Sequence, residues 1–187
     1  MSEYLAMTTA RTCSLTPVGG KGEITREMVA AACRALNNHS MLYALVKFSG
    51  SDGDWLNLVF AHELYIRDKA KLEGWQLKEK DTDEQMKLFC YEVLKESVNP
   101  PKCPYCGGRK VIMPSPKYGE TESKLCKACN GTGRGKGMNP YRLSEILGCS
   151  WKRANSFWFP RYQEIISMME ALDSDIDYLI WRELNGD

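Results

Sequence analysis

The stretch that decides the fold of this chain begins with C-P-Y-C (Cys103 and Cys106) and continues with C-K-A-C (Cys126 and Cys129). A spacer of nineteen residues separates the two pairs. Two thiolates separated by two residues can bind one metal ion when the backbone turns tightly, and paired C-x2-C elements at this separation are typical of zinc sites. Glycines follow both pairs, as such turns require. The spacing therefore predicts one zinc ion bound by these four cysteines.

Two other states of the four cysteines stay open, namely two disulfide bonds or four free thiols. Disulfides fit poorly, because the chain begins M-S-E-Y-L-A-M-T-T-A, which lacks the basic flank and apolar stretch of a secretory signal. No apolar run approaches the roughly 20 residues that a membrane-spanning helix needs. We therefore expect a cytoplasmic protein without membrane contact. Four thiolates leave no open coordination position, so the expected zinc ion is structural.

The residues that follow, Asn139 to Pro160, predict a helix-turn-helix. Asn139 and Pro140 suit the start of a first helix, Gly148 suits its end, and Ser150 suits the cap of a second helix. We expect Pro160 to stop that second helix. The side chains expected to point outward from it, and so to contact DNA, are Ser150, Trp151, Lys152, Arg153, Asn155 and Ser156.

Arginine, lysine and asparagine are the side chains that bind base edges and phosphates in a major groove. Arg134 and Lys136, in the glycine-rich run before the first helix, are further candidates for contact with DNA phosphates. An ordinary helical hairpin is the alternative interpretation, because the pattern L-x-x-I-L-G also occurs in helical bundles.

The net charge of +1 conceals an uneven distribution. Residues 1–100 carry 12 Lys+Arg and 14 Asp+Glu, residues 101–161 carry 12 and 3, and residues 162–187 carry 1 and 7. The formal charges of the three segments are therefore −2, +9 and −6. A basic segment that holds a zinc site and a helix-turn-helix is typical of a nucleic-acid-binding protein. A solvated lysine-rich surface is the alternative.

Helical periodicity marks the N-terminal half. A helix is expected over residues 55–72, with an inner face formed by Leu56, Val59, Phe60, Leu64 and Ala70. We expect His62 to be a surface or half-buried residue of this helix and His39 to lie in a polar loop. Thr82 and Gln85 form a capping-box pattern before a helix that ends by residue 98, where N-P-P follows.

The sequence thus predicts a mainly α protein, a helical bundle with an inserted four-cysteine zinc-binding module and a helix-turn-helix near the C-terminus. The expected divisions are a flexible arm (1–22), a helical domain (23–98), the zinc-binding module (102–134), the helix-turn-helix (139–160) and a C-terminal helix that packs on the core (161–187).

This order of elements resembles the Q late-gene antiterminators of lambdoid bacteriophages, over roughly residues 23–182. The matching stretches are M-V-A-A-A-C-R-A-L-N-N-H-S-M-L-Y-A-L-V-K-F, C-P-Y-C-G-G, C-K-A-C-N-G-T-G and W-K-R-A-N-S-F-W. The second cysteine pair continues as C-x-x-C-x-G-x-G, whereas the first has Lys110 in place of the last glycine. This departure leaves the shape of the first turn open.

The resemblance implies a function in transcription. It implies that the protein binds double-stranded DNA within a phage late promoter, with the reading helix beginning at Ser150. The protein would then load onto the bacterial RNA polymerase holoenzyme at a promoter-proximal pause and make it read through terminators, in the cytoplasm of the host cell. The resemblance does not place the residues that contact the polymerase, and the oligomeric state is open.

Three other functions were weighed. A zinc-containing regulator that acts at initiation would share every DNA-binding feature. A DnaJ-type chaperone module has the same cysteine–glycine pattern, but this chain has only enough cysteine pairs for one ion and lacks the H-P-D motif. An enzyme is not expected, because the chain has two histidines and no pairing of a nucleophile with a base.

Overall fold

The computed structural model describes residues 24–78, 81–112 and 123–185, so the arm expected over residues 1–22 lies outside the described residues. The described chain is mainly helical, as predicted. In chain order its elements are α1 (Arg26–Ala32), α2 (Asn38–Ser49), the short 3-10 helix η1 (Asp52–Asp54), α3 (Trp55–Leu72), α4 (Asp83–Val98), β1 (Val111–Ile112), β2 (Lys124–Leu125), α5 (Pro140–Leu147), α6 (Trp151–Arg153), the π-helical turn η3 (Ala154–Trp158) and α7 (Phe159–Asn185).

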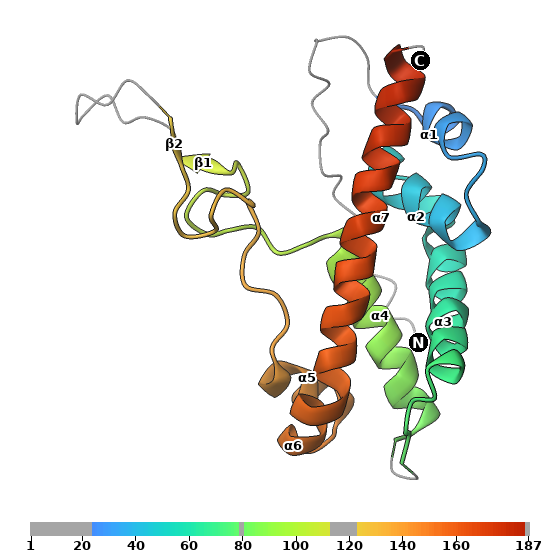
Figure 1. Ribbon diagram of the computed structural model, residues 1–187, viewed down its shortest axis with the longest axis vertical. Coiled ribbons are helices and arrows are strands. Elements are labelled where there is room, and N and C mark those ends of the chain that lie inside the picture. Colours follow the sequence, from blue (N-terminus) through green and yellow to red (C-terminus); the bar gives the residue numbers. More distant parts are fainter. Residues whose placement is uncertain (1–23, 79–80, 113–122, 186–187) are drawn as a thin grey trace. The chain divides into compact units, whose positions relative to one another are not determined.

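The chain folds into two compact units (Figure 1). Among the described residues, one unit combines the chain from residue 24 to residue 99 with residues 140–185, and the other is the insertion that begins at Pro100 and ends at Asn139. The helices before and after the insertion therefore share one bundle. No helix in the described part of the chain has the length and apolar character needed to cross a membrane.

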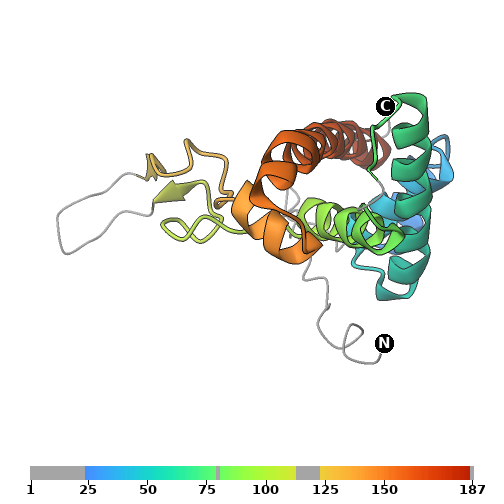
Figure 2. The same cartoon turned by 90° about the horizontal axis from the view of Figure 1, so that it is seen from below.

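Within the bundle, α7 is the longest helix and contacts α1 and α4, whereas α3 contacts α2 and α4. Figures 1 and 2 show α3 at one edge of the bundle, on the side away from α5 and α6. Apolar side chains from the segments before and after the insertion meet in the core of the bundle. Trp158 is fully buried, with its ring centre 5.0 Å from that of Phe89 on α4.

The predicted capping box starts α4. The Thr82 side chain accepts a hydrogen bond from the Gln85 backbone N–H at 3.2 Å, and the Gln85 side-chain oxygen accepts one from the Thr82 N–H at 3.1 Å. The Gln85 amide nitrogen also donates to the Leu147 carbonyl oxygen at 2.7 Å. The same side chain therefore caps α4 and satisfies a free carbonyl at the end of α5.

The inner face of α3 differs from the predicted one, although its bounds match the expected range. Leu58, His62 and Ile66 are fully buried, whereas Leu56, Phe60 and Leu64 point to solvent. The sequence offers two sets of side chains at helical spacing, and the more apolar set faces outward. The predicted face was therefore wrong for Leu56, Phe60 and Leu64, whereas Val59 is half-buried and Ala70 is buried.

Both histidines lie in the interior, contrary to the predicted surface and loop positions. His39 occupies the first turn of α2, and its Nε2 lies 2.9 Å from Nδ1 of His62 on α3. The His39 ring stacks on Tyr65, with ring centres 4.6 Å apart. Burial lowers the pKa of His39 to about 4, and burial together with the neighbouring His39 lowers the pKa of His62 to about 3. Both rings are therefore neutral at pH 7.

The histidine pair predicts that the helical bundle loses stability in mild acid. The unfolded chain protonates each histidine near its ordinary pKa of about 6.5, whereas the folded chain does so only near pH 4 and pH 3. Stability is therefore complete above about pH 6.5 and falls as the pH drops toward the folded-state values. Between pH 7 and pH 5 we expect a loss of about 2 kcal/mol per histidine in the free energy of unfolding.

Urea unfolding followed by helical circular dichroism at a series of pH values measures this loss. The matched variant is His62→Gln, which removes one titrating group and should reduce the loss by about half, whatever its effect at pH 7. If the free energy of unfolding of this variant falls with pH as steeply as that of the wild type, other groups cause the acid sensitivity.

Candidate metal centre and candidate nucleic-acid interface

The insertion brings together the four cysteines that the sequence singled out. Each offers one sulfur atom, and the four Sγ atoms of Cys103, Cys106, Cys126 and Cys129 lie within 4.8 Å of one another. The Cys103–Cys126 and Cys106–Cys129 sulfur distances are 3.9 and 3.8 Å. Sulfurs at about 2.3 Å from a tetrahedral zinc ion are about 3.8 Å apart, so the separations suit a metal ion such as zinc.

The same distances argue against the disulfide alternative. A disulfide holds its sulfurs at about 2.05 Å, and these four cysteines are all free thiols in the structure. Three of them are buried and Cys129 is half-buried. Among the described residues, no other buried apolar side chain belongs to the cluster of these four sulfurs, which fits a metal centre better than a packed core.

The metal site is built from two copies of one turn, related by a shift of 23 residues. The Cys103 N–H donates to the Gly133 carbonyl at 2.8 Å, and the Cys126 N–H donates to the Lys110 carbonyl at 3.0 Å. Each turn therefore accepts a hydrogen bond from the first cysteine of the other. The backbone pairing shows the same correspondence between the two turns. Val111 pairs with Leu125 in the strand pair, and Lys102 pairs with Arg134 in an isolated bridge.

Left-handed backbone positions also correspond between the two turns. Gly131 and Gly133 have φ values of 76° in the second turn, and the corresponding Gly108 and Lys110 have φ values of 87° and 67° in the first. Lys110, the departure from the cysteine–glycine pattern, thus keeps the glycine-like conformation. The first turn therefore has the same shape as the second. Its left-handed backbone strains Lys110, because a Cβ atom disfavours this region.

Gly133 is required for a second reason. A Cβ atom there would lie 2.6 Å from the Gly108 carbonyl oxygen, because the two turns cross at this point. Its N–H donates to the Cys129 sulfur at 3.3 Å. Burial raises the pKa of Cys129, but hydrogen bonds to its sulfur outweigh burial and lower the pKa to about 6. Burial raises the pKa of Cys126 to about 11, so the thiolate form is favoured at Cys129 and disfavoured at Cys126.

We expect Cys126→Ser to abolish metal binding and to unfold the insertion while the helical bundle stays folded. The binding free energy of a structural metal is also folding free energy, and the bundle has its own core. Metal content after purification without chelator, and thermal unfolding of the helical signal, measure the two effects. The control is Cys149→Ser, a half-buried cysteine outside the cluster, which should keep the full metal content.

Two glycine-related variants should change metal affinity in opposite directions. Lys110→Gly should tighten binding by about two- to fivefold, because relief of left-handed strain (about 1–2 kcal/mol) exceeds the added chain entropy of glycine (about 0.5–1 kcal/mol). Gly133→Ala should weaken binding, because its Cβ atom meets backbone. Competition with a chromogenic chelator measures both. Weaker binding by the Lys110→Gly variant would show that this lysine stabilises the turn.

The second candidate site is the corner where α5 meets α6. Gly148 ends α5 with a φ of 58°, as predicted, and the Ser150 side chain accepts a hydrogen bond from the Arg153 N–H at 3.2 Å. Ser144 is buried where α5 lies against the following π turn, and Leu143 and Leu147 complete that inner face. A tight turn therefore joins α5 to the helix that begins at Trp151.

The second helix does not stop at Pro160, and that prediction was wrong. The chain stays helical from Trp151 to Asn185, with the π-helical turn η3 directly before the proline. A proline lacks an N–H and crowds the carbonyl four residues earlier. The wider π turn accommodates this proline, so α6 leads directly into α7 instead of forming a separate recognition helix.

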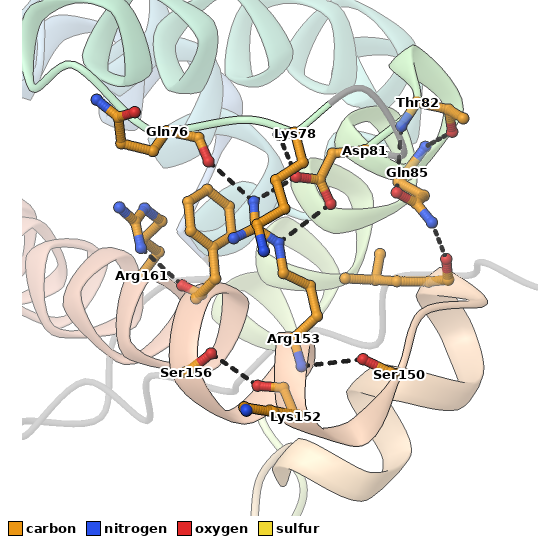
Figure 3. A network of polar contacts seen from close by, with 12 residues as sticks. Gln76, Lys78, Asp81, Thr82, Gln85, Ser150, Lys152, Arg153, Ser156 and Arg161 are labelled. Atoms are coloured by element: carbon orange, nitrogen blue, oxygen red, sulfur yellow. Dashed lines mark hydrogen bonds and ion pairs between the residues drawn. The ribbon is translucent and has the colours of Figure 1, made fainter.

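Arg153 points into the bundle, contrary to its expected outward position (Figure 3). Its Nε donates to Asp81 at 3.2 Å, its Nη2 makes a further short contact with the same carboxylate, and Nη2 also donates to the Gln76 carbonyl at 2.9 Å. Its guanidinium carbon lies 3.5 Å from the ring centre of Phe157. Burial raises the pKa of Asp81, but Arg153 and the Lys78 N–H outweigh burial and lower it. Arg153 therefore fixes α6 to the loop before α4.

The remaining predicted side chains of this helix stay on the outside. Trp151 is 57% exposed, and Ser150, Lys152, Asn155 and Ser156 are also exposed. Sequence reasoning did not name Tyr141 and Arg142, which are exposed in the first turn of α5, at the end of that helix opposite to Gly148. Their position just after Pro140, in the first turn of an amphipathic helix, was the signal that could have identified them.

Arg134 and Lys136 belong to the insertion and not to the bundle that carries the corner. Lys136 is exposed, whereas Arg134 is half-buried in its bridge with Lys102. The structure therefore brings Trp151, Lys152 and Asn155 together on one surface and leaves these two residues in a separate unit.

A comparison with protein-family models finds none that matches this chain, and a comparison with curated proteins also finds no match.

Proposed function

We propose that this protein is a sequence-specific DNA-binding transcription antitermination factor that acts on bacterial RNA polymerase. The observation that carries the proposal is the exposed face of the α5–α6 corner. Trp151, Lys152, Asn155 and Ser156 share the outer side of a helix whose inner side, including Ala154 and Trp158, is buried. Lysine and asparagine on one exposed helix face suit a DNA groove.

Charge supports the same proposal. The segment from residue 101 to residue 161 carries a formal charge of +9, and ligated thiolates would reduce it by about two. Such a segment attracts the phosphate backbone over distances longer than side-chain contact. The acidic helix α7 does not oppose this, because part of its charge is neutralised inside the bundle, where Asp173 pairs with Lys47.

The cysteine cluster is assigned one structural zinc ion, held by Cys103, Cys106, Cys126 and Cys129. The metal would cross-link the two turns of the insertion, and it has no open position for a substrate. The proposed role is therefore binding and not catalysis.

Antitermination is the part of the proposal that follows from the resemblance to Q proteins. A plain regulator of initiation would need only the DNA-binding corner and its supporting helices. The part of the chain before the insertion is not basic, since residues 1–100 carry a formal charge of −2. Such a surface suits a protein partner such as RNA polymerase better than a second stretch of DNA.

The test begins with the DNA sequences that the intact, metal-loaded protein selects from a random pool. Lys152→Ala should weaken binding to all sequences and reduce the salt slope by about 1, because it removes a phosphate contact. Asn155→Ala should cost about 1–3 kcal/mol on the preferred sequence and relax specificity at one position. Lys95→Ala removes an exposed lysine from α4 and should leave both quantities unchanged.

The selected sequence is then placed within a promoter upstream of a terminator and transcribed by purified bacterial RNA polymerase. Read-through should rise with the wild-type protein and fall with both corner variants in proportion to their loss of DNA affinity. A changed rate of initiation without read-through would support the regulator alternative instead. If no sequence is selected, the corner is not a DNA-binding site.

A further inference from the structure

The positive charge of the chain is concentrated in the insertion. Residues 100–139 hold 8 Lys+Arg and 2 Asp+Glu, whereas the rest of the chain holds 17 and 22, so the formal charges are +6 and −5. A divalent metal ion bound by four thiolates would lower the first value by about two. The rest of the chain, which includes the α5–α6 corner, is therefore acidic as a whole, and the insertion is the unit that attracts a polyanion.

The basic side chains of the insertion are exposed and are not interspersed with acidic ones. Its described residues, 100–112 and 123–139, contain seven lysines and arginines and no aspartate or glutamate. An ordinary solvated surface carries charges of both signs in alternation, so this composition points to an anionic partner. Six of the seven side chains are exposed, namely Lys102, Arg109, Lys110, Lys124, Lys127 and Lys136.

Three of the basic residues gather at the first cysteine turn. The Lys102 side chain lies against this turn, since a Cβ atom on Gly108 would be 3.4 Å from Lys102 Cγ. Arg109 is held to the same turn, because its Nε donates to the Cys106 carbonyl oxygen at 3.2 Å, a hydrogen bond that does not use its two terminal nitrogens. The backbone bridge between Lys102 and Arg134 adds a third basic residue.

An aromatic ring is exposed in the same turn. Tyr105 lies between Cys103 and Cys106 and is 74% exposed. The corresponding residue of the second turn, 23 positions later, is Ala128, so the metal site itself does not require a ring there. Bases of a single strand stack on exposed aromatic rings, whereas the bases of a duplex are already stacked on one another. A ring beside basic side chains therefore suits a single strand.

The secondary structure of the insertion favours the same partner. Its described residues contain no helix, and β1 and β2 have two residues each. Base edges in the major groove of a duplex are read by a helix or a two-stranded ribbon that fills the groove. Contact with phosphates and stacking of bases need neither element.

We propose that the insertion binds single-stranded nucleic acid, with a base stacked on Tyr105 and phosphates held by Lys102 and Arg109. This site is additional to the duplex-binding face proposed for the α5–α6 corner and does not depend on it. The metal ion shapes the turn that presents the ring and takes no direct part in binding.

Fluorescence anisotropy of the intact, metal-loaded protein with labelled oligo-dT, oligo-U and duplex DNA, each of about 16 nucleotides, tests the proposal. Tyr105→Ala should weaken binding of the single strands at least about fivefold, because it removes a stacking platform, and should leave duplex binding unchanged. Tyr105→Phe keeps the ring and should bind as the wild type does. The control is Tyr178→Ala, which removes a 58% exposed tyrosine from α7.

Charge variants test the phosphate contacts. Lys102→Gln keeps most of the aliphatic stem and should reduce the salt slope for single strands by about 0.7. Lys71→Gln removes a lysine that is 80% exposed on α3 and should leave this slope unchanged. Lys152→Ala, in the α5–α6 corner, should weaken duplex binding alone, so failure of the corner and failure of this site give different results. Metal content equal to that of the wild type shows that each variant keeps its cysteine turns.

Three results would overturn the proposal. The first is equal binding of the single strands by the Tyr105→Ala and Tyr178→Ala variants, and the second is an equal salt slope for Lys102→Gln and Lys71→Gln. The third is displacement of the oligonucleotides by polyglutamate at equal charge concentration, which would indicate an acidic protein surface as the partner. A preference for oligo-U or for oligo-dT supports the proposal and assigns the site to RNA or to single-stranded DNA.

Discussion

The helical bundle depends on the contacts that the buried ammonium group of Lys47 makes with α4 and α7. The Nζ atom lies 2.5 Å from the Asp173 carboxylate on α7 and 2.6 Å from the Ser97 carbonyl oxygen near the end of α4. It also donates to the Tyr43 hydroxyl at 2.9 Å. A buried charge that loses its partner costs roughly 3–5 kcal/mol, so α4 and α7 must both be in place when α2 packs. Since α4 precedes the insertion and α7 follows it, this contact closes the bundle across the insertion. The folding of the cysteine module can therefore depend on its metal, because the core of the bundle does not include that module.

Local signals in the sequence were enough where a single turn decides the structure. The capping box at Thr82, the left-handed Gly148 and the cap at Ser150 each depend on residues within a few positions, and all three formed as predicted. The cysteine spacing succeeded for the same reason, because each pair makes its own turn. The correspondence between the turns, with Lys110 in a glycine-like conformation, needed the structure, since residue identity alone argues against a lysine there.

Sequence reasoning failed where distant segments compete for one side chain. Arg153 follows the Ser150 cap on a short helix and resembles a base-reading residue, but Asp81, 72 positions earlier, binds it. No local pattern shows that pairing. Pro160 was read as a stop because a proline breaks regular α-helical hydrogen bonding, and the π turn that accommodates it depends on the buried contacts of Phe157 and Trp158. The helix that begins at Trp151 is therefore continuous with α7.

The α3 helix is oriented with its more apolar face toward solvent. Turning this helix about its axis would bury Leu56, Phe60 and Leu64, which are more apolar than the set that includes His62. The same rotation would expose Leu58 and Ile66, which are now fully buried, so the net loss is roughly the burial of one phenylalanine, about 1.5–3 kcal/mol. The His39–His62 contact and the stacking of His39 on Tyr65 offset part of this loss and fix the helix in its observed rotation. The buried histidines and the exposed apolar face of Leu56, Phe60 and Leu64 are thus two consequences of one rotation.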